Sequence, residues 1–168
     1  RADIAAVNGL IGAGRPGAAL AALRAAVPLP GSLGRICPAY CERVCRRHAD
    51  GEAVAVRALE RFAADAGAAE APLPPRATAT GKRVAVVGAG PAGLSAAWFL
   101  LLAGHECDLF EARELPGGTL RRLVPEFFLP RATLDADIAP ILSAGARLHA
   151  GVRLGRDIAL GDLRRAHD

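Results

Sequence analysis

The stretch that decides the fold reads Arg83-Val-Ala-Val-Val-Gly88-Ala-Gly90-Pro91-Ala92-Gly93, and a long apolar segment follows it. The apolar residues before the first glycine predict a strand that is buried on both faces. Three glycines then follow at G-x-G-x-x-G spacing. Gly88 allows a sharp turn, Gly90 leaves room for a pyrophosphate group, and Gly93 lets a helix pack close to the sheet. The stretch therefore predicts a βαβ unit that binds a dinucleotide.

The residues around the glycines support the same interpretation. Pro91 and Ala92 open the helix, whose free N–H groups and positive dipole end suit a phosphate. Glu111 ends the next strand, and a carboxylate there accepts hydrogen bonds from ribose hydroxyls and repels a 2′-phosphate. The site is therefore expected to take FAD or NAD and not NADP. The alternative is a cofactor-free Rossmann-like domain in which the glycines serve only a tight turn.

Composition narrows the possible functions of the chain. Its 168 residues are 52% hydrophobic, which is ample for a core, and the net charge of +4 comes from arginine because Lys82 is the only lysine. The sequence has no basic stripe with interleaved aromatic residues, which argues against nucleic-acid binding. The longest apolar run, residues 96–103, is far shorter than the roughly 18 residues of a membrane crossing. We expect a cytoplasmic protein that binds no membrane, and a chain that is a piece of a longer polypeptide because it begins at Arg1.

A proline- and alanine-rich linker, residues 67–81, separates a helical domain over 1–66 from an α/β domain over 82–168. In the first half, apolar periodicity predicts one helix near the start and a second that begins at Pro16 and is ended by Pro28 and Pro30. A third helix is expected over about 54–66. Its inward residues would be Leu59, Phe62 and Ala66, and its outward residues Glu60, Arg61 and Asp65.

The second half alternates strands with helices. Strands are expected at 83–87, 106–110 and about 147–152, with helices at 91–103, about 132–143 and 162–167. Pro140 is expected to interrupt the helix in which it lies. This alternation predicts a right-handed, parallel α/β sheet.

Three of the four cysteines, Cys37, Cys41 and Cys45, follow one another at C-x3-C-x3-C spacing. Zinc sites usually need a second, distant pair, and the radical-SAM signature differs by one residue. Ligation of an iron-sulfur cluster is the favoured interpretation, with zinc-bound or free thiols as the alternatives. A disulfide is disfavoured by the odd number of cysteines in the group. Cys107 is expected to be a small buried residue of the second strand.

Several motifs in order resemble one known family. They are Gly34-Arg-Ile-Cys37-Pro-Ala-Tyr-Cys41-Glu-Arg-Val-Cys45, Ala58-Leu-Glu60-Arg-Phe62, the glycine motif, and Val124-Pro-Glu-Phe-Phe128-Leu-Pro130, which is similar to the family's I-P-x-F-R-L-P. In this order they resemble the small (beta) subunit of NADPH-dependent glutamate synthase. The N-terminal part of dihydropyrimidine dehydrogenase belongs to the same family. The resemblance covers nearly the whole chain.

The resemblance implies an oxidoreductase that relays electrons. In the family, NADPH reduces FAD, and [4Fe-4S] clusters in the helical domain carry electrons to a large catalytic subunit or a fused oxidoreductase domain. The implied cluster ligands are Cys37, Cys41 and Cys45, with Glu60 as a further candidate. The implied FAD-binding residues are Gly88, Gly90, Pro91, Ala92, Gly93, Glu111, Gly117 and Gly118. The Gly117-Gly118 pair favours FAD, since the family's chain passes close to the flavin end there.

The sequence also departs from the family. A second cysteine group would lie before Arg1, and the NADPH-binding motif would follow Asp168. Phe128 stands where the family has arginine. NADPH is therefore expected to bind outside this chain, no residue here is assigned a catalytic role, and residues 1–168 alone are expected to be inactive, with the first strand exposed as a sheet edge. Two other classes remain: a non-catalytic interaction module with zinc-bound thiols, and the NAD-binding domain of a dehydrogenase.

Overall fold

The computed structural model describes residues 2–168, which form two compact units that meet between Leu73 and Pro74. The first unit contains helices only, and the second alternates helices with three parallel strands. The predicted fold class, an all-α unit followed by an incomplete Rossmann-like α/β unit, is confirmed. None of the helices within residues 2–168 has the length and apolar character that a membrane crossing requires.

The helical unit packs around a small aliphatic core. Its elements are α1 (Ile4–Gly12), α2 (Pro16–Arg24), α3 (Pro30–Ile36), α4 (Tyr40–Arg43), the 3-10 helix η1 (Arg46–Ala49) and α5 (Val56–Gly67). The core consists of Val7, Ala19, Leu20, Leu23 and Ala63. These residues come from α1, α2 and α5, so the three helices stabilise one another by excluding water from their shared face.

Two sequence predictions about this unit are wrong. Pro30 begins α3 and does not end α2, because proline suits the first turn of a helix. In α5, Phe62 is 49% exposed and Ala66 is exposed, whereas Ala63 and Gly67 are buried. A Cβ on Gly67 would lie 2.4 Å from the carbonyl oxygen of Pro16. Such close approach of α5 to α2 accepts only small residues, so α5 turns its small residues inward.

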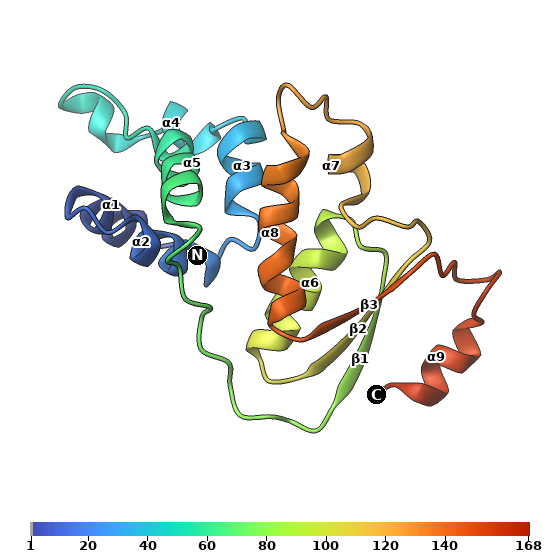
Figure 1. Ribbon diagram of the computed structural model, residues 1–168. Coiled ribbons are helices and arrows are strands. Elements are labelled where there is room, and N and C mark those ends of the chain that lie inside the picture. Colours follow the sequence, from blue (N-terminus) through green and yellow to red (C-terminus); the bar gives the residue numbers. More distant parts are fainter. Residues whose placement is uncertain (1) are drawn as a thin grey trace. The chain divides into compact units, whose positions relative to one another are not determined.

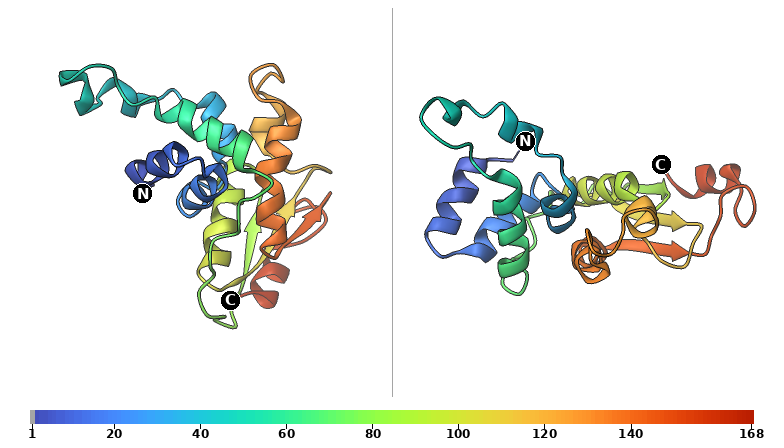
Figure 2. Two further views of the ribbon diagram at one scale, coloured as in Figure 1. Left: turned by 60° about the vertical axis from the view of Figure 1, so that its left-hand side comes forward. Right: turned by 90° about the horizontal axis from the view of Figure 1, so that it is seen from above.

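The α/β unit is built on three parallel strands in the order β1-β2-β3. Its elements are β1 (Arg83–Val87), α6 (Pro91–Leu102), β2 (Glu106–Glu111), α7 (Gly118–Arg122), α8 (Arg131–Ser143), β3 (Ala146–Ala150) and α9 (Leu160–Ala166). Helices α6 and α8 lie side by side against one face of the sheet, and α9 lies on its other side (Figures 1 and 2). This is the arrangement expected of right-handed parallel crossovers.

Three details of the α/β unit differ from the sequence predictions. β1 is half-exposed and not buried on both faces, because within the described residues it forms the edge of the sheet. Helix α8 continues through Pro140 to Ser143, so the proline does not interrupt it. The short helix α7, directly after Gly117, has no counterpart in the sequence prediction.

The segment before β1 is attached to the α/β unit. The backbone N–H of Ala77 donates to the carbonyl of Leu102, and that of Thr80 donates to the carbonyl of Gly104. Arg76 adds side-chain hydrogen bonds to the carbonyls of Leu101 and Ala144. These contacts fix the entry to β1 and hence the position of the glycine loop at its far end.

Candidate functional site

The loop between β1 and α6 is held on both sides by hydrogen bonds. The carboxylate of Glu111 is buried at the end of β2, and its Oε2 accepts from the backbone N–H of Ala89 at 2.8 Å. The carbonyl of Ala89 accepts from the N–H of Gly117 at 2.7 Å. The N–H of Gly88 donates to the carbonyl of Phe110 at 2.7 Å. The loop is therefore preformed without a ligand.

The three glycines of this loop have different steric reasons. Gly88 has a φ of +98°, a left-handed conformation that favours glycine, as a sharp turn out of β1 requires. A Cβ on Gly93 would lie 1.8 Å from the carbonyl oxygen of Gly88, so α6 packs directly on the turn. A Cβ on Gly90 would meet only Gly118 Cα at 3.8 Å. The space beside Gly90 is therefore left open by the fold.

The paired glycines Gly117 and Gly118 complete this cradle. Gly117 has a φ of +117° and Gly118 a φ of +51°. A Cβ on Gly118 would lie 2.6 Å from Gly90 Cα, so the two backbones approach each other closely. The sequence prediction attributed this pair to the passage of a flavin, and the structure adds a second reason, the contact with Gly90.

The N-terminus of α6 points its unpaired amides at the cradle. The first backbone hydrogen bond of α6 runs from Leu94 N to Gly90 O, so the N–H groups of Ala92 and Gly93 precede it. Pro91, at the first helical position, has no N–H to leave unpaired. Open backbone, free amides and the dipole of a twelve-residue helix together make an anion site of the kind that binds pyrophosphate.

An open cavity of about 390 Å³ lies next to Gly118. It is lined by Arg113, Glu114, Leu115, Gly118, Arg121 and Arg122. Arg121 is held in place, since its Nε donates to the carbonyl of Pro116 and its Nη2 pairs with Asp135. The three arginines give the cavity an excess of positive charge, which suits an anionic ligand.

A dinucleotide fits this part of the chain on two observations. The cradle at Gly90 and Gly118 has space that a Cβ would fill, and the Glu111 carboxylate keeps acceptor capacity beyond its bonds to Ala89 N and Arg113 N. The sequence analysis assigned Glu111 to the ribose alone. Its bonds to two backbone amides show that it also anchors the loop.

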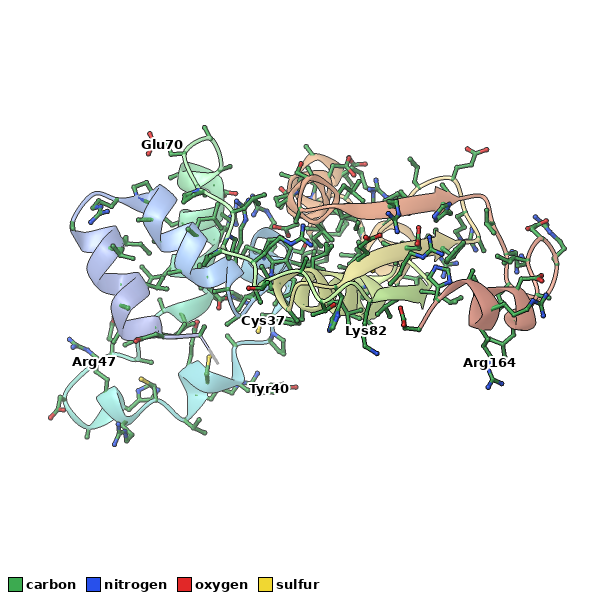
Figure 3. The ribbon with its side chains drawn as sticks, turned by 90° about the horizontal axis from the view of Figure 1, so that it is seen from below. Cys37, Tyr40, Arg47, Glu70, Lys82 and Arg164 are labelled. Carbon is green, nitrogen blue, oxygen red and sulfur yellow. The ribbon has the colours of Figure 1, made fainter. Side chains whose placement is uncertain are left out.

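The second candidate site, the cysteine segment 37–45, runs from the end of α3 to the start of η1 (Figure 3). Cys37 ends α3 and Cys45 precedes η1, and both are half-buried. Cys41 lies in α4 and is exposed. All three are free thiols, as is the buried Cys107, whose pKa burial raises to about 11. The three cysteines therefore lie on successive short turns and not along one helix face.

Polar contacts tie the cysteine segment to the start of α5. Glu42 Oε1 accepts from the backbone N–H of Arg57 at 2.8 Å, and Arg57 Nη1 donates to the carbonyl of Cys37 at 3.0 Å. Glu60, one turn further along α5, was predicted to lie on a solvated face. It is half-buried instead, and burial together with the nearby Glu42 charge raises its pKa. The raised pKa places Glu60 close to the segment.

Two local features mark the cysteine segment as chemically distinct. Ala39 has a φ of +54° although it carries a Cβ, a strained conformation of the kind found at binding loops. Hydrogen bonds from the backbone amides of Val54 and Arg47 lower the pKa of Cys45, which favours the thiolate. A thiolate is the form of cysteine that binds metal.

The fit of the segment to a cluster is chemical and not geometric. Free thiols are the donors that iron-sulfur clusters require. Among residues 2–168, however, the structure brings no three Cys, His, Asp or Glu side chains into an arrangement that could hold a metal ion. We therefore derive no electron-transfer step through these thiols.

Sequence reasoning missed a third polar group. Asp108 lies in the middle of β2 between two fully buried residues, Cys107 and Leu109, and its carboxylate gathers Arg147, His149 and His167. The signal was present in the sequence, since an acid within an otherwise apolar strand needs buried partners.

Comparisons with known proteins assign each unit to a domain type. Residues 2–71 match the family described as "Dihydroprymidine dehydrogenase domain II, 4Fe-4S cluster". Residues 86–153 match the family described as "NAD(P)-binding Rossmann-like domain". The two matches correspond to the helical unit with the cysteine segment and to the sheet with the glycine loop.

Curated relatives match both units together. The chain is 38% identical over 96% of its length to the glutamate synthase [NADPH] small chain of Mycobacterium tuberculosis. It is 35% identical over 99% of its length to the NADP(+)-dependent formate dehydrogenase subunit beta of Moorella thermoacetica. It is 39% identical over 87% of its length to the NADPH-Fe(3+) oxidoreductase subunit beta of Geobacter sulfurreducens. The matches span 33%, 27% and 22% of these relatives, respectively, so the chain covers a third of their length or less.

Proposed function

Because this chain belongs to the family of glutamate synthase small subunits, we propose that it supplies the iron-sulfur unit and the first half of the FAD site of an NAD(P)H-dependent oxidoreductase. The observation that carries the proposal is the order of the two units, a cysteine-bearing helical unit followed directly by a glycine cradle. The relatives named above are oxidoreductase subunits that use NADPH or NADP(+).

Glu111 supports FAD, and not NADPH, as the ligand of the cradle. Its carboxylate lies at the end of β2, where the adenosine ribose of a Rossmann-bound dinucleotide lies. A 2′-phosphate there would meet a buried negative charge. An NADPH-dependent enzyme with this cradle therefore needs a different site for NADPH, which we place outside residues 1–168.

The chain's own residues bind and orient the proposed FAD. Glu111 would accept hydrogen bonds from the ribose, and the amides of Ala92 and Gly93 would donate to the pyrophosphate beside Gly90. The arginines of the cavity next to Gly118 would balance the phosphate charge. When bound, FAD supplies the ability to take up a hydride and release single electrons.

We propose that Cys37, Cys41 and Cys45 ligate a [4Fe-4S] cluster, with Glu60 as a candidate for a further ligand. The family match over residues 2–71 supports the cluster, and the lowered pKa of Cys45 supports a thiolate. We further propose that the electrons pass to a larger catalytic subunit or domain and that the protein works in the cytoplasm.

An absorbance spectrum with iron and zinc analysis of the anaerobically purified protein tests this function. Flavin bands with a broad brown shoulder and bound iron are expected. A colourless protein that contains zinc would support an interaction module instead. A colourless protein without metal that binds NAD would support the dehydrogenase alternative, and either result would contradict the proposal.

A further inference from the structure

One buried carboxylate on the face of the sheet opposite α6 gathers charged groups from several elements. Asp108 of β2 is 5% exposed. Arg147 of β3 donates to both of its oxygens at 3.0 Å, and His149 Nε2 lies 2.7 Å from Oδ1. From α9, His167 Nε2 lies 3.1 Å from Oδ2. The proposed cofactor site uses none of these groups.

Asp108 is ionised in this arrangement. The bidentate Arg147 hydrogen bonds, followed by those of His149 and His167, hold the pKa of Asp108 well below its usual range. The cause is the ordinary preference of a buried carboxylate for charged donors. Asp108 can therefore only accept hydrogen bonds across the neutral pH range.

His167 stands between two acceptors. Its Nε2 faces the Asp108 carboxylate, and its Nδ1 lies 3.0 Å from the carbonyl oxygen of Leu163. Neither acceptor has a hydrogen to give, so both ring nitrogens must carry one, which only the imidazolium form does. The ring is nearly buried, with a side-chain exposure of 9%, and the edge of Phe110 packs against it.

We propose that His167 and Asp108 form a proton-dependent latch that holds α9 against the sheet. With His167 doubly protonated, α9 is bound by an ion pair to β2 and by a bond that closes its own last turn. Loss of one proton removes one of the two hydrogen bonds and leaves a nearly buried acceptor unpaired. The docking of α9 therefore weakens as the pH rises through the range where histidine changes charge.

The other charged groups around the latch keep their charge in this range. Arg83 of β1 lies 3.9 Å from Asp108 Oδ2, and its guanidinium donates to the carbonyl of Ala166. Asp168 Oδ2 accepts from the backbone N–H of Arg83. Asp162 and Arg164 line the cavities on the two sides of His167. These groups hold α9 in part at any neutral pH, so the latch loosens the helix and does not release it.

His149 is the one other histidine in contact with Asp108, and its geometry differs. It stacks on Phe110 with ring centroids 4.6 Å apart, and a single ring nitrogen faces Asp108. A neutral imidazole protonated at Nε2 satisfies this contact. The latch therefore assigns the pH response to His167 and not to His149.

Nitrogen NMR of the histidine rings tests the protonation state directly. At about pH 6 to 7, both ring nitrogens of His167 should be protonated, and His149 and the exposed His48 serve as internal references. A neutral single tautomer of His167 at about pH 6 would overturn the proposal.

Amide exchange of residues 160–166, corrected for the intrinsic pH dependence, tests the docking. The opening equilibrium of α9 should rise at least about tenfold between about pH 6 and about pH 9. His167→Gln should be open to the same extent at both pH values, and Asp108→Asn should behave alike. His149→Gln should keep the parent's pH response. An unchanged pH response in His167→Gln would contradict the latch, even if Asp108→Asn fails to fold.

Discussion

The glycine loop and the cysteine segment are both candidate cofactor sites, but they are built in opposite ways. The glycine loop consists of backbone atoms held by Glu111, Gly117 and the packing of α6, so its shape exists without a ligand. The cysteine segment offers side chains on short, mostly exposed turns that come together only if a metal gathers them. A backbone site is part of the fold, whereas a thiolate site is assembled by its metal.

The largest expected effect is the loss of the α/β unit on changing Gly93 to Ala. The new Cβ would lie 1.8 Å from the carbonyl oxygen of Gly88, which backbone cannot avoid without moving α6. We expect a loss of roughly 3 kcal/mol or more in the free energy of unfolding of this unit. Trp98, the only tryptophan, is buried in α6 and reports its unfolding by fluorescence.

The matched control for this prediction is Gly9→Ala in the helical unit. No atom lies within 4 Å of its Cβ position, and alanine favours a helix, so a gain of up to about 1 kcal/mol is expected. Equal stability of the Gly93 variant and the parent would show that α6 does not pack on the glycine turn.

Next in size is the loss of cluster iron on changing Cys41 to Ser. If the cysteine segment binds a [4Fe-4S] cluster, most of that cluster's iron should be lost while the FAD content stays near the parent value. The control is Cys107→Ser, in which a buried strand residue changes and stability, not iron, should fall. Parent-like iron in the Cys41 variant would exclude Cys41 as a ligand.

A smaller effect is expected when Glu111 is changed to Ala. FAD binding should weaken by about 1.5 to 3 kcal/mol, measured by titration of the flavin-free protein, because the ribose loses a charged acceptor. Glu111→Gln helps to separate this loss from loop damage, since its amide oxygen can still accept from Ala89 N. Glu126→Ala, an exposed carboxylate elsewhere, should bind FAD like the parent. Unchanged affinity in both Glu111 variants would exclude the ribose contact.

The smallest effect is expected for Gly90→Ala, and it is the most specific. The new Cβ meets only Gly118 Cα at 3.8 Å, and the φ of −78° suits any residue, so the free protein should melt like the parent. FAD affinity should nevertheless fall about tenfold, near 1.4 kcal/mol, because the methyl group occupies the proposed place of the pyrophosphate. Parent-like affinity would mean that no ligand approaches Gly90.

The contrast between the two sites also explains what the sequence predicted well. Gly88, Gly93 and the strands around them obey local rules of turn conformation, spacing and apolar periodicity, and the parallel sheet followed from them. The inward face of α5 did not follow, because the choice between Phe62 and Ala63 depends on the approach of α2 through Gly67. Periodicity fixes the interval between inward residues, but tertiary packing fixes which residue starts it.

The second role of Glu111 and the cluster of charges around Asp108 were also beyond the sequence rules. Each depends on partners from distant parts of the chain, Ala89 in the first case and His149 and His167 in the second. The ligand role of the cysteines stays a prediction, since their spacing fixes the donor chemistry and not the geometry in which donors meet.

The flavin and iron contents of one set of anaerobic preparations test the central claim most directly, namely that the two units hold two cofactors independently. The parent should contain both, Gly90→Ala should lose flavin on dilution and keep its iron, and Cys41→Ser should lose iron and keep its flavin. A parent without flavin or iron, or variants that lose both cofactors together while remaining folded, would contradict the account.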